Sequence, residues 1–134
     1  MDIRDWDNLR RVLRDLHRAL VDRASRDYVW AKQRLSQPDP GELLQILIKD
    51  PEFAWLRSLS ELMVDIDIAR DNEKTREQLA PNVRAAVERF ITAPADPSTA
   101  DDFAQHYWPY VQQDPHVAMA HGAVKQAIGS WPRG

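Results

Sequence analysis

Four Asp-Pro dipeptides divide this chain of 134 residues into segments, and they limit its fold more than any other feature. An aspartate at the N-cap of a helix accepts hydrogen bonds from backbone N–H groups of the first turn, and a proline at the first helical position loses no hydrogen bond. Each dipeptide is therefore a signal for a helix start. We expect helices to begin at three or more of the sites, which are Asp39-Pro40, Asp50-Pro51, Asp96-Pro97 and Asp114-Pro115.

The segment before the first dipeptide predicts one long helix over about residues 3–35. With successive residues about 100° apart, its apolar side chains form a single stripe, and three arginines lie on the opposite face. This pattern is typical of an amphipathic helix with one face in the core and one in water. The stripe consists of Leu9, Leu13, Leu16, Leu20 and Ala24, and the arginines are Arg4, Arg11 and Arg18.

Five further helical segments follow from the punctuation and the apolar spacing. The second segment, residues 40–49, is so rich in Leu and Ile that we expect it to be largely buried. The third, residues 51–70, carries Phe53, Val64 and Ile68 outside its main apolar stripe, which is typical of a helix in the middle of a bundle. The others are expected near residues 75–91, 97–110 and 115–128, with residues 129–134 as a tail.

These segments predict an all-α fold, a compact bundle of five to six helices in a single domain over residues 1–134. We expect the long first and third helices to pack antiparallel across the short second one. No run approaches the roughly 20 apolar residues that a membrane span needs, so no membrane partner is predicted. The chain has no cysteine and nothing in it requires an oxidising compartment, so we expect a cytoplasmic protein.

The net charge of −3 is unevenly distributed along the chain. Residues 1–35 contain nine Lys/Arg and six Asp, a balance of +3, whereas the remainder contains nine Lys/Arg and fifteen Asp/Glu, a balance of −6. The basic first helix is expected to attract acidic groups, either in the same fold or on another chain. Within the fold, we expect Asp67 to pair with one of its arginines. The asymmetry is too small for a nucleic-acid-binding protein, and no nucleic-acid partner is predicted.

Three of the four histidines lie on or beside apolar stripes, which makes them candidate ligands for a metal or haem. They are His17, His106 and His121, and Glu61 or Asp65 could supply oxygen ligands. However, the chain contains neither the Glu-x-x-His nor the His-x-x-x-His spacing of helical metal sites. We therefore favour hydrogen-bonded histidines at the core or its boundary, with no cofactor, and keep the metal or haem site as the alternative.

The sequence does not favour an enzyme. Glu61 and Asp65 lie one helical turn apart and could form an acid–base pair, but both point away from the apolar stripe, so a solvated face is the preferred interpretation. The Gly-x-Ser-x-Gly signature of hydrolases and glycine-rich phosphate loops are absent from the sequence.

A protein-interaction module, with self-association as one form of it, is the function that the sequence favours. Large aromatic residues outside the main stripes and a face of arginines are the features from which such an interface could be built. The predicted interface residues are Arg4, Arg11, Arg18, Trp30, Trp55 and Trp108.

One stretch resembles a group of small bacterial helical proteins of unassigned function. It is Asp-Pro-Glu-Phe-Ala-Trp-Leu-Arg-Ser-Leu-Ser-Glu-Leu at residues 50–62, preceded by Gly-Glu-Leu-Leu-Gln-Ile-Leu at 41–47. The resemblance is centred on residues 41–66 and extends over about residues 9–128. It implies a bacterial, cytosolic, all-α protein, and it assigns no catalytic residue.

Overall fold

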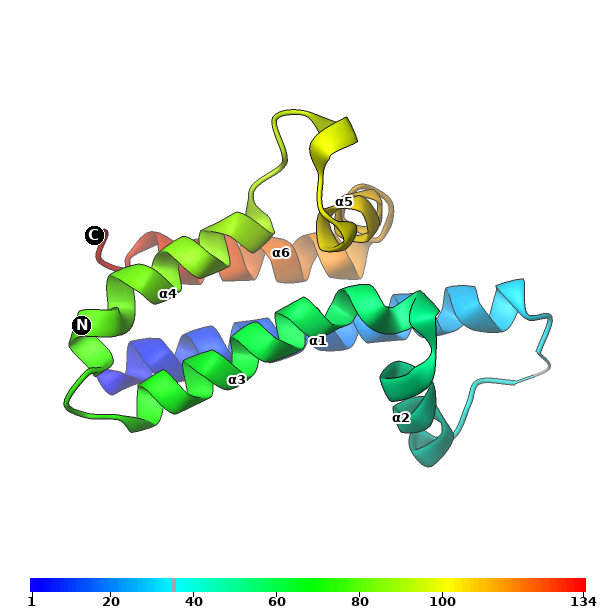
Figure 1. The fold of residues 1–134 in the computed structure, drawn as a ribbon, viewed down its shortest axis with the longest axis horizontal. Helices are drawn as coiled ribbons and strands as arrows, with labels where there is room; N and C mark the ends of the chain where they lie inside the picture. Colours follow the sequence, from blue (N-terminus) through cyan, green and yellow to red (C-terminus); the bar gives the residue numbers. More distant parts are fainter. Residues whose placement is uncertain (35) are drawn as a thin grey trace.

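The computed structural model describes residues 1–34 and 36–134, which form six α-helices and two short 3₁₀ helices (Figure 1). The all-α bundle predicted from the sequence is thereby confirmed. In chain order the elements are α1 (Ile3–Ala31), α2 (Pro40–Lys49), η1 (Pro51–Leu56), α3 (Arg57–Asp71), α4 (Arg76–Ile91), η2 (Pro97–Thr99), α5 (Asp102–Gln113) and α6 (Pro115–Gly129).

All four Asp-Pro dipeptides begin helical segments, as expected. Each aspartate side chain accepts a hydrogen bond from the backbone N–H two or three residues later, and each proline occupies the first helical turn. Two of the sites start α-helices and two start 3₁₀ turns. The expected third helix is therefore divided, because residues 51–56 form η1 and the regular α-helix begins at Arg57.

Helix α1 is the central element of the bundle and packs against α3, α5 and α6, most extensively against α6. All five members of its predicted apolar stripe are buried. The helix ends at Ala31, earlier than expected, and Gln33 takes a left-handed φ of 53° just beyond it. The expected endpoint at residue 35 lies outside the described residues.

Helices α1 and α3 lie antiparallel and side by side, as predicted (Figure 1). The predicted ion pair exists: Arg10 Nε donates to Asp67 Oδ1 at 2.6 Å. A second pair joins the same helices, with Arg70 Nε donating to Asp7 Oδ1 at 2.9 Å. The hydrogen bond from Arg70 lowers the pKa of Asp7 below its usual value, against a smaller opposing effect of desolvation.

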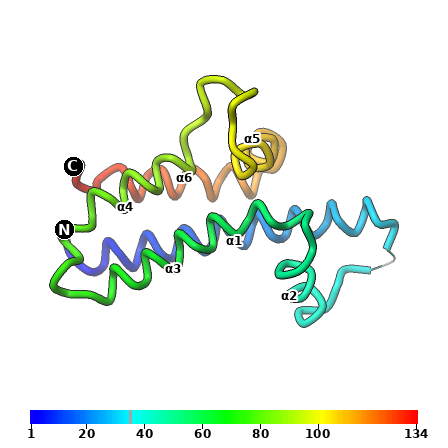
Figure 2. The backbone as a smooth tube through the Cα atoms, viewed as in Figure 1, coloured from blue at the N-terminus to red at the C-terminus, as the bar shows by residue number. Residues whose placement is uncertain are grey.

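The position of α2 differs from the prediction. We expected this helix to be largely buried between α1 and α3, but none of its residues is buried. Figure 2 shows it projecting from the α1–α3 pair near the start of α3. Helix α3 is likewise not in the middle of the bundle, because Val64 and Ile68 are exposed.

Buried Asp114 joins α1 to the start of α6. Its carboxylate accepts hydrogen bonds from the backbone N–H of His116 at 2.9 Å and of Val117 at 3.2 Å, and from Arg23 at 3.3 Å. Burial alone raises the pKa of this carboxyl, but the hydrogen bonds outweigh it, and the pKa lies below its usual value. Asp114 is thus ionised and serves as a structural anchor.

The prediction that residues 129–134 form a tail is wrong for Trp131. Only 2% of this residue is exposed, and its ring packs on Trp6 with centroids 4.7 Å apart. Buried Arg84 donates hydrogen bonds to the carbonyl oxygens of Gly129 and Trp131. Residues at both ends of the chain therefore belong to one core.

Candidate interaction surface

The apolar side chains of α2 form one wall of an open groove. Leu43, Ile46 and Leu47 are half-buried. Leu44 and Ile48 are 55% and 54% exposed, which is unusual for aliphatic residues of an apolar helix. The helix forms because Asp39 caps it by accepting the Glu42 N–H at 2.8 Å. The cap stabilises the first turn of the helix, while Leu44 and Ile48 remain exposed to solvent.

The groove lies between α2 and the helices α1 and α3, and has a volume of about 590 Å³. Buried Phe53 and Leu56 of η1 contribute to its lining. Arg57 Nη2 donates to the Ile48 carbonyl at 2.6 Å, which fixes the end of α2 against the start of α3. The groove is lined by His17, Leu44, Leu47, Ile48, Phe53, Leu56, Arg57 and Ser60.

His17 is one of three polar residues that line the groove, together with Arg57 and Ser60. Its Nε2 lies 3.1 Å from the Ser60 hydroxyl, across the α1–α3 contact. Burial lowers the pKa of this imidazole below its ordinary value, because the charged form loses solvation. The ring is therefore mostly neutral at pH 7, and the groove carries no buried charge at this point.

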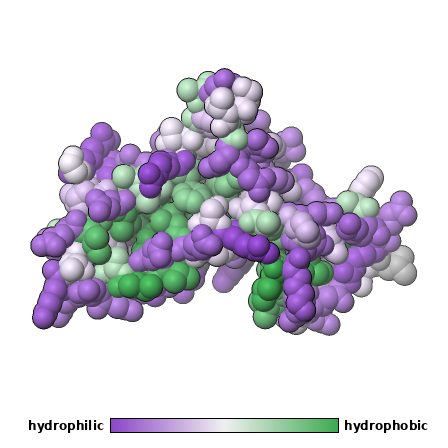
Figure 3. Space-filling view, in the orientation of Figure 1, coloured by the Kyte–Doolittle hydropathy of each residue, from purple (hydrophilic) through white to green (hydrophobic). Residues whose placement is uncertain are grey.

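A second group of exposed apolar side chains lies on the outer side of α3. Val64 is 55% exposed and Ile68 is 65% exposed, and the two lie one helical turn apart. Figure 3 shows apolar side chains both along the edge of α3 and on the side of α2 that borders the hollow. A second, smaller hollow of about 130 Å³ lies between α1 and α3, lined by Arg10, Leu13, Arg14, Met63, Ile66 and Asp67.

The predicted interface residues do not gather on one surface. Trp55 is wrong as an interface residue, because it is 4% exposed and stacks on His106 with ring centroids 5.0 Å apart. Trp108 is half-buried, and Trp30 is 84% exposed at the end of α1. The arginines are on the exposed face of α1, where Arg4 pairs with Asp2, Arg11 with Asp15, and Arg18 with no carboxylate of the described residues.

The candidate metal ligands are also apart. His17 contacts Ser60, whereas His121 Nδ1 lies 2.6 Å from the Tyr107 hydroxyl and His106 Nδ1 lies 2.9 Å from the Asp102 carbonyl. The described residues contain no group of three or more His, Cys, Asp or Glu that could hold a metal ion. His17 and His121 are half-buried as expected, but His106 is exposed, so its predicted place at the boundary of the core is wrong.

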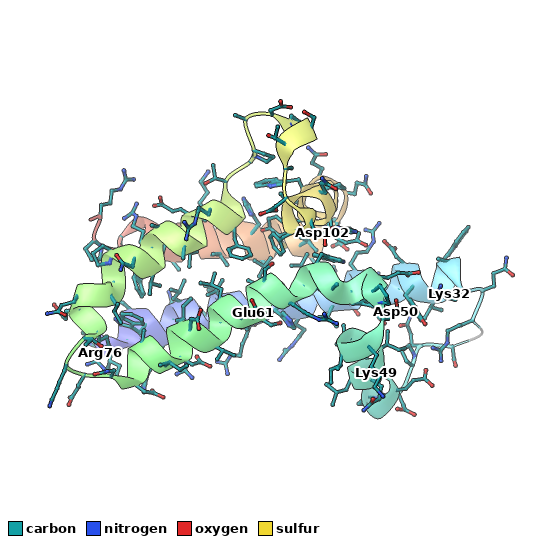
Figure 4. All side chains as sticks on the ribbon, viewed as in Figure 1. Lys32, Lys49, Asp50, Glu61, Arg76 and Asp102 are labelled. Atoms are coloured by element: carbon teal, nitrogen blue, oxygen red, sulfur yellow. The ribbon has the colours of Figure 1, made fainter. Side chains whose placement is uncertain are left out.

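The two carboxylates considered as ligands or as an acid–base pair lie on the solvated face of α3. Glu61 and Asp65 are exposed, in agreement with the preferred interpretation. Figure 4 shows Glu61 near the middle of α3 and Asp102 at the start of α5, on separate elements. No histidine of the described chain contacts Glu61 or Asp65, so these residues do not form the proposed site.

The residues that border the groove were not identified as a site from the sequence. In the sequence, Val64 and Ile68 lie outside the main apolar stripe of this helix, a pattern that we interpret as burial on two sides. The same deviation fits an exposed apolar stripe equally well, and a sequence pattern alone does not distinguish the two.

Comparison with family models, with curated proteins and with solved structures finds no match for this chain. Within the part of the chain that the structure describes, no helix has the length and apolar character needed to cross a membrane.

Proposed function

We propose that this protein is a helical protein-interaction module and that its binding surface is the groove beside α2 together with the adjoining stripe of α3. The observation that carries the proposal is the exposure of Leu44, Ile48, Val64 and Ile68 on two neighbouring elements. Exposed apolar side chains beside a hollow are typical of protein-binding sites.

The shape and chemistry of the groove support a protein partner. Its apolar walls favour the insertion of aliphatic or aromatic side chains, as in the grooves that receive a helix. His17 Nε2 lies 3.1 Å from the Ser60 hydroxyl, but no carboxylate of the described residues forms a hydrogen bond with the His17 ring, so the group that would orient the imidazole in a Ser-His-Asp triad is missing. This is the reason for preferring a binding role to an enzymatic one.

We also propose that the partner is a protein and not a nucleic acid, and that the chain is cytoplasmic. The net charge is −3, and most arginines of α1 already pair with aspartates of this chain. Arginines that are neutralised within the fold contribute little to phosphate binding.

A site-specific crosslinking experiment tests the proposal. A photoreactive phenylalanine analogue replaces Leu44, and in a matched control it replaces Met119, which is 74% exposed on α6. We expect a defined protein adduct, either a different chain or this one, from position 44 and none from position 119. The purified partner is then titrated by calorimetry, and the double variant Leu44→Glu, Ile48→Glu should bind about tenfold more weakly or worse, whereas Met119→Glu binds as the wild type does. Equal adducts from both positions, or equal affinity of both variants, would contradict the proposal.

A further inference from the structure

We propose that the surface of α2 and α3 binds a second copy of this chain, and that the two copies form a two-fold symmetric dimer. The inference rests on the proposed function, because it names the partner of the same surface. The geometry points to this partner because the chain carries both halves of a complementary contact: cations on α1, carboxylates on α3, and exposed apolar side chains between and beside them.

Two cations beside this surface have no partner within the described chain. Seven arginines lie in α1, and five of them form ion pairs with aspartates. The two exceptions are Arg14 and Arg18, which are exposed on either side of His17 in the sequence. They form neither an ion pair nor a side-chain hydrogen bond with any described residue, so they are available to carboxylates of another molecule.

The carboxylates of α3 show the matching division. Asp67 pairs with Arg10, and Asp71 pairs with Arg70 at 3.0 Å. Glu61 and Asp65 are exposed and form no ion pair with the described residues. The surface therefore presents two cations and two carboxylates that this fold leaves without partners.

The register of α1 and α3 places these charges at matching heights. Arg10 contacts Asp67, and His17 contacts Ser60. In each contact the two residue numbers add to 77, so a residue of α1 is level with the residue of α3 whose number completes that sum. In the same register Glu61 is level with residue 16 and Asp65 with residue 12. Each carboxylate is thus two residues, or about 3 Å along the helix axis, from Arg18 and Arg14 respectively.

The order of the faces fixes the symmetry. Ser60 and Asp67, which contact α1, lie on one flank of the Val64–Ile68 stripe, and Glu61 and Asp65 lie on the other flank. Across the surface the order is therefore arginines, hollow, apolar stripe, carboxylates. This hollow is the one of about 130 Å³ between α1 and α3. A two-fold axis that is parallel to the helices and close to this hollow places the apolar stripe of each copy in the hollow of the other.

This arrangement also pairs the free arginines of each copy with the free carboxylates of the other, so the same set of ion pairs forms twice. Glu61 and Asp65 of each copy come to lie over Arg18 and Arg14 of its partner, so the contact is isologous, as in most homodimers. The exposed Leu44 and Ile48 of α2 add apolar area beside the start of α3. Each copy thus supplies the hollow and arginines that bind its partner, and the stripe and carboxylates that its partner binds.

Sedimentation velocity with charge-reversed variants tests the dimer. The wild-type chain is measured from about 1 μM to about 1 mM, the range of a weak protein contact, at low and at high salt. We expect dimers that weaken as salt increases, because rim charges are screened. Arg14→Glu, Arg18→Glu and, separately, Glu61→Arg, Asp65→Arg should each weaken self-association about tenfold or more.

Mixing the two reversed variants gives the decisive result. In the mixture both halves of the contact again join opposite charges, so we expect a heterodimer where each variant alone is monomeric. Arg89→Glu, Lys125→Glu reverses two exposed charges elsewhere and should dimerise as the wild type does. Thermal unfolding followed by circular dichroism checks that every variant is folded.

A wild-type chain that stays monomeric at every concentration, or a mixture that does not associate, would overturn the dimer. A monomer whose position 44 still crosslinks to a different protein would leave the proposed interaction function in place. The failure of the dimer and the failure of the function are therefore distinguished.

Discussion

At the scale of single residues, the environment decides what each large aromatic side chain does. The five tryptophans are alike in the sequence, yet Trp6 and Trp131 lie in the core, and Trp30 is almost fully exposed. Trp6 belongs to the first helix and Trp131 to the last residues, so their contact joins the two ends of the fold. This contact cannot be predicted from the residue type or from the residues that adjoin each tryptophan in the sequence.

We predict that Trp131→Ala lowers the free energy of unfolding by about 3–5 kcal/mol, the usual cost of removing a large buried ring. Trp30→Ala, with its side chain in water, should change it by less than about 0.5 kcal/mol. Chemical denaturation followed by circular dichroism measures both. Similar losses for the two variants would show that Trp131 is not part of the core.

At the scale of helices, the sequence was sufficient to locate most elements but not to place them. Asp-Pro capping is a local effect, so helical turns at three or more of the dipeptides could be predicted, although two of the four turns are 3₁₀ and α5 itself begins at Asp102. The burial of α2 could not, because it depends on which distant elements cover the helix, and α2 contacts mainly the adjacent η1. A helix with five aliphatic residues is expected to be buried, and α2 is an exception because part of its apolar side faces a groove.

We predict that α2 opens independently of the rest of the bundle. Its side chains contribute little to the core, so local unfolding exposes little additional apolar surface. Amide hydrogen exchange, measured at a concentration where the chain is monomeric, should show residues 43–49 at least about 100-fold less protected than residues 12–20 of α1. Equal protection of the two segments would mean that α2 unfolds only with the whole molecule.

At the scale of the whole molecule, the charge distribution of the sequence indicates how distant elements contact one another. The excess of arginine in the first segment predicted contacts with acidic groups, and the structure shows such contacts at Asp67 and at Asp114. The site itself could not be predicted, since its residues come from three elements separated by up to about fifty positions. Only the fold shows that Arg14 and Arg18 lack partners among the described residues, and that Leu44 and His17 line the same groove.

The whole fold should lose stability in two steps as the pH falls. Burial lowers the pKa of His17 and of His121 in the folded protein below the ordinary value of 6.5. The unfolded chain therefore binds more protons than the folded one just below pH 6.5, and the free energy of unfolding decreases there until the folded pKa values are passed. Asp7 and Asp114 have lowered pKa values relative to 3.8, so their contribution is present above that pH and is lost only under more acidic conditions.

The first step can be assigned by substitution. Denaturant unfolding between about pH 7.5 and about pH 5 should show a clear decrease for the wild type and a flatter profile for His17→Gln, His121→Gln, whose amides can still hydrogen bond with Ser60 and Tyr107. His116→Gln is the matched control, because His116 is exposed at the start of α6, and its profile should follow the wild type. An unchanged slope in the double variant would mean that neither buried imidazole resists protonation, and that the acid sensitivity of the bundle comes from its carboxylates alone.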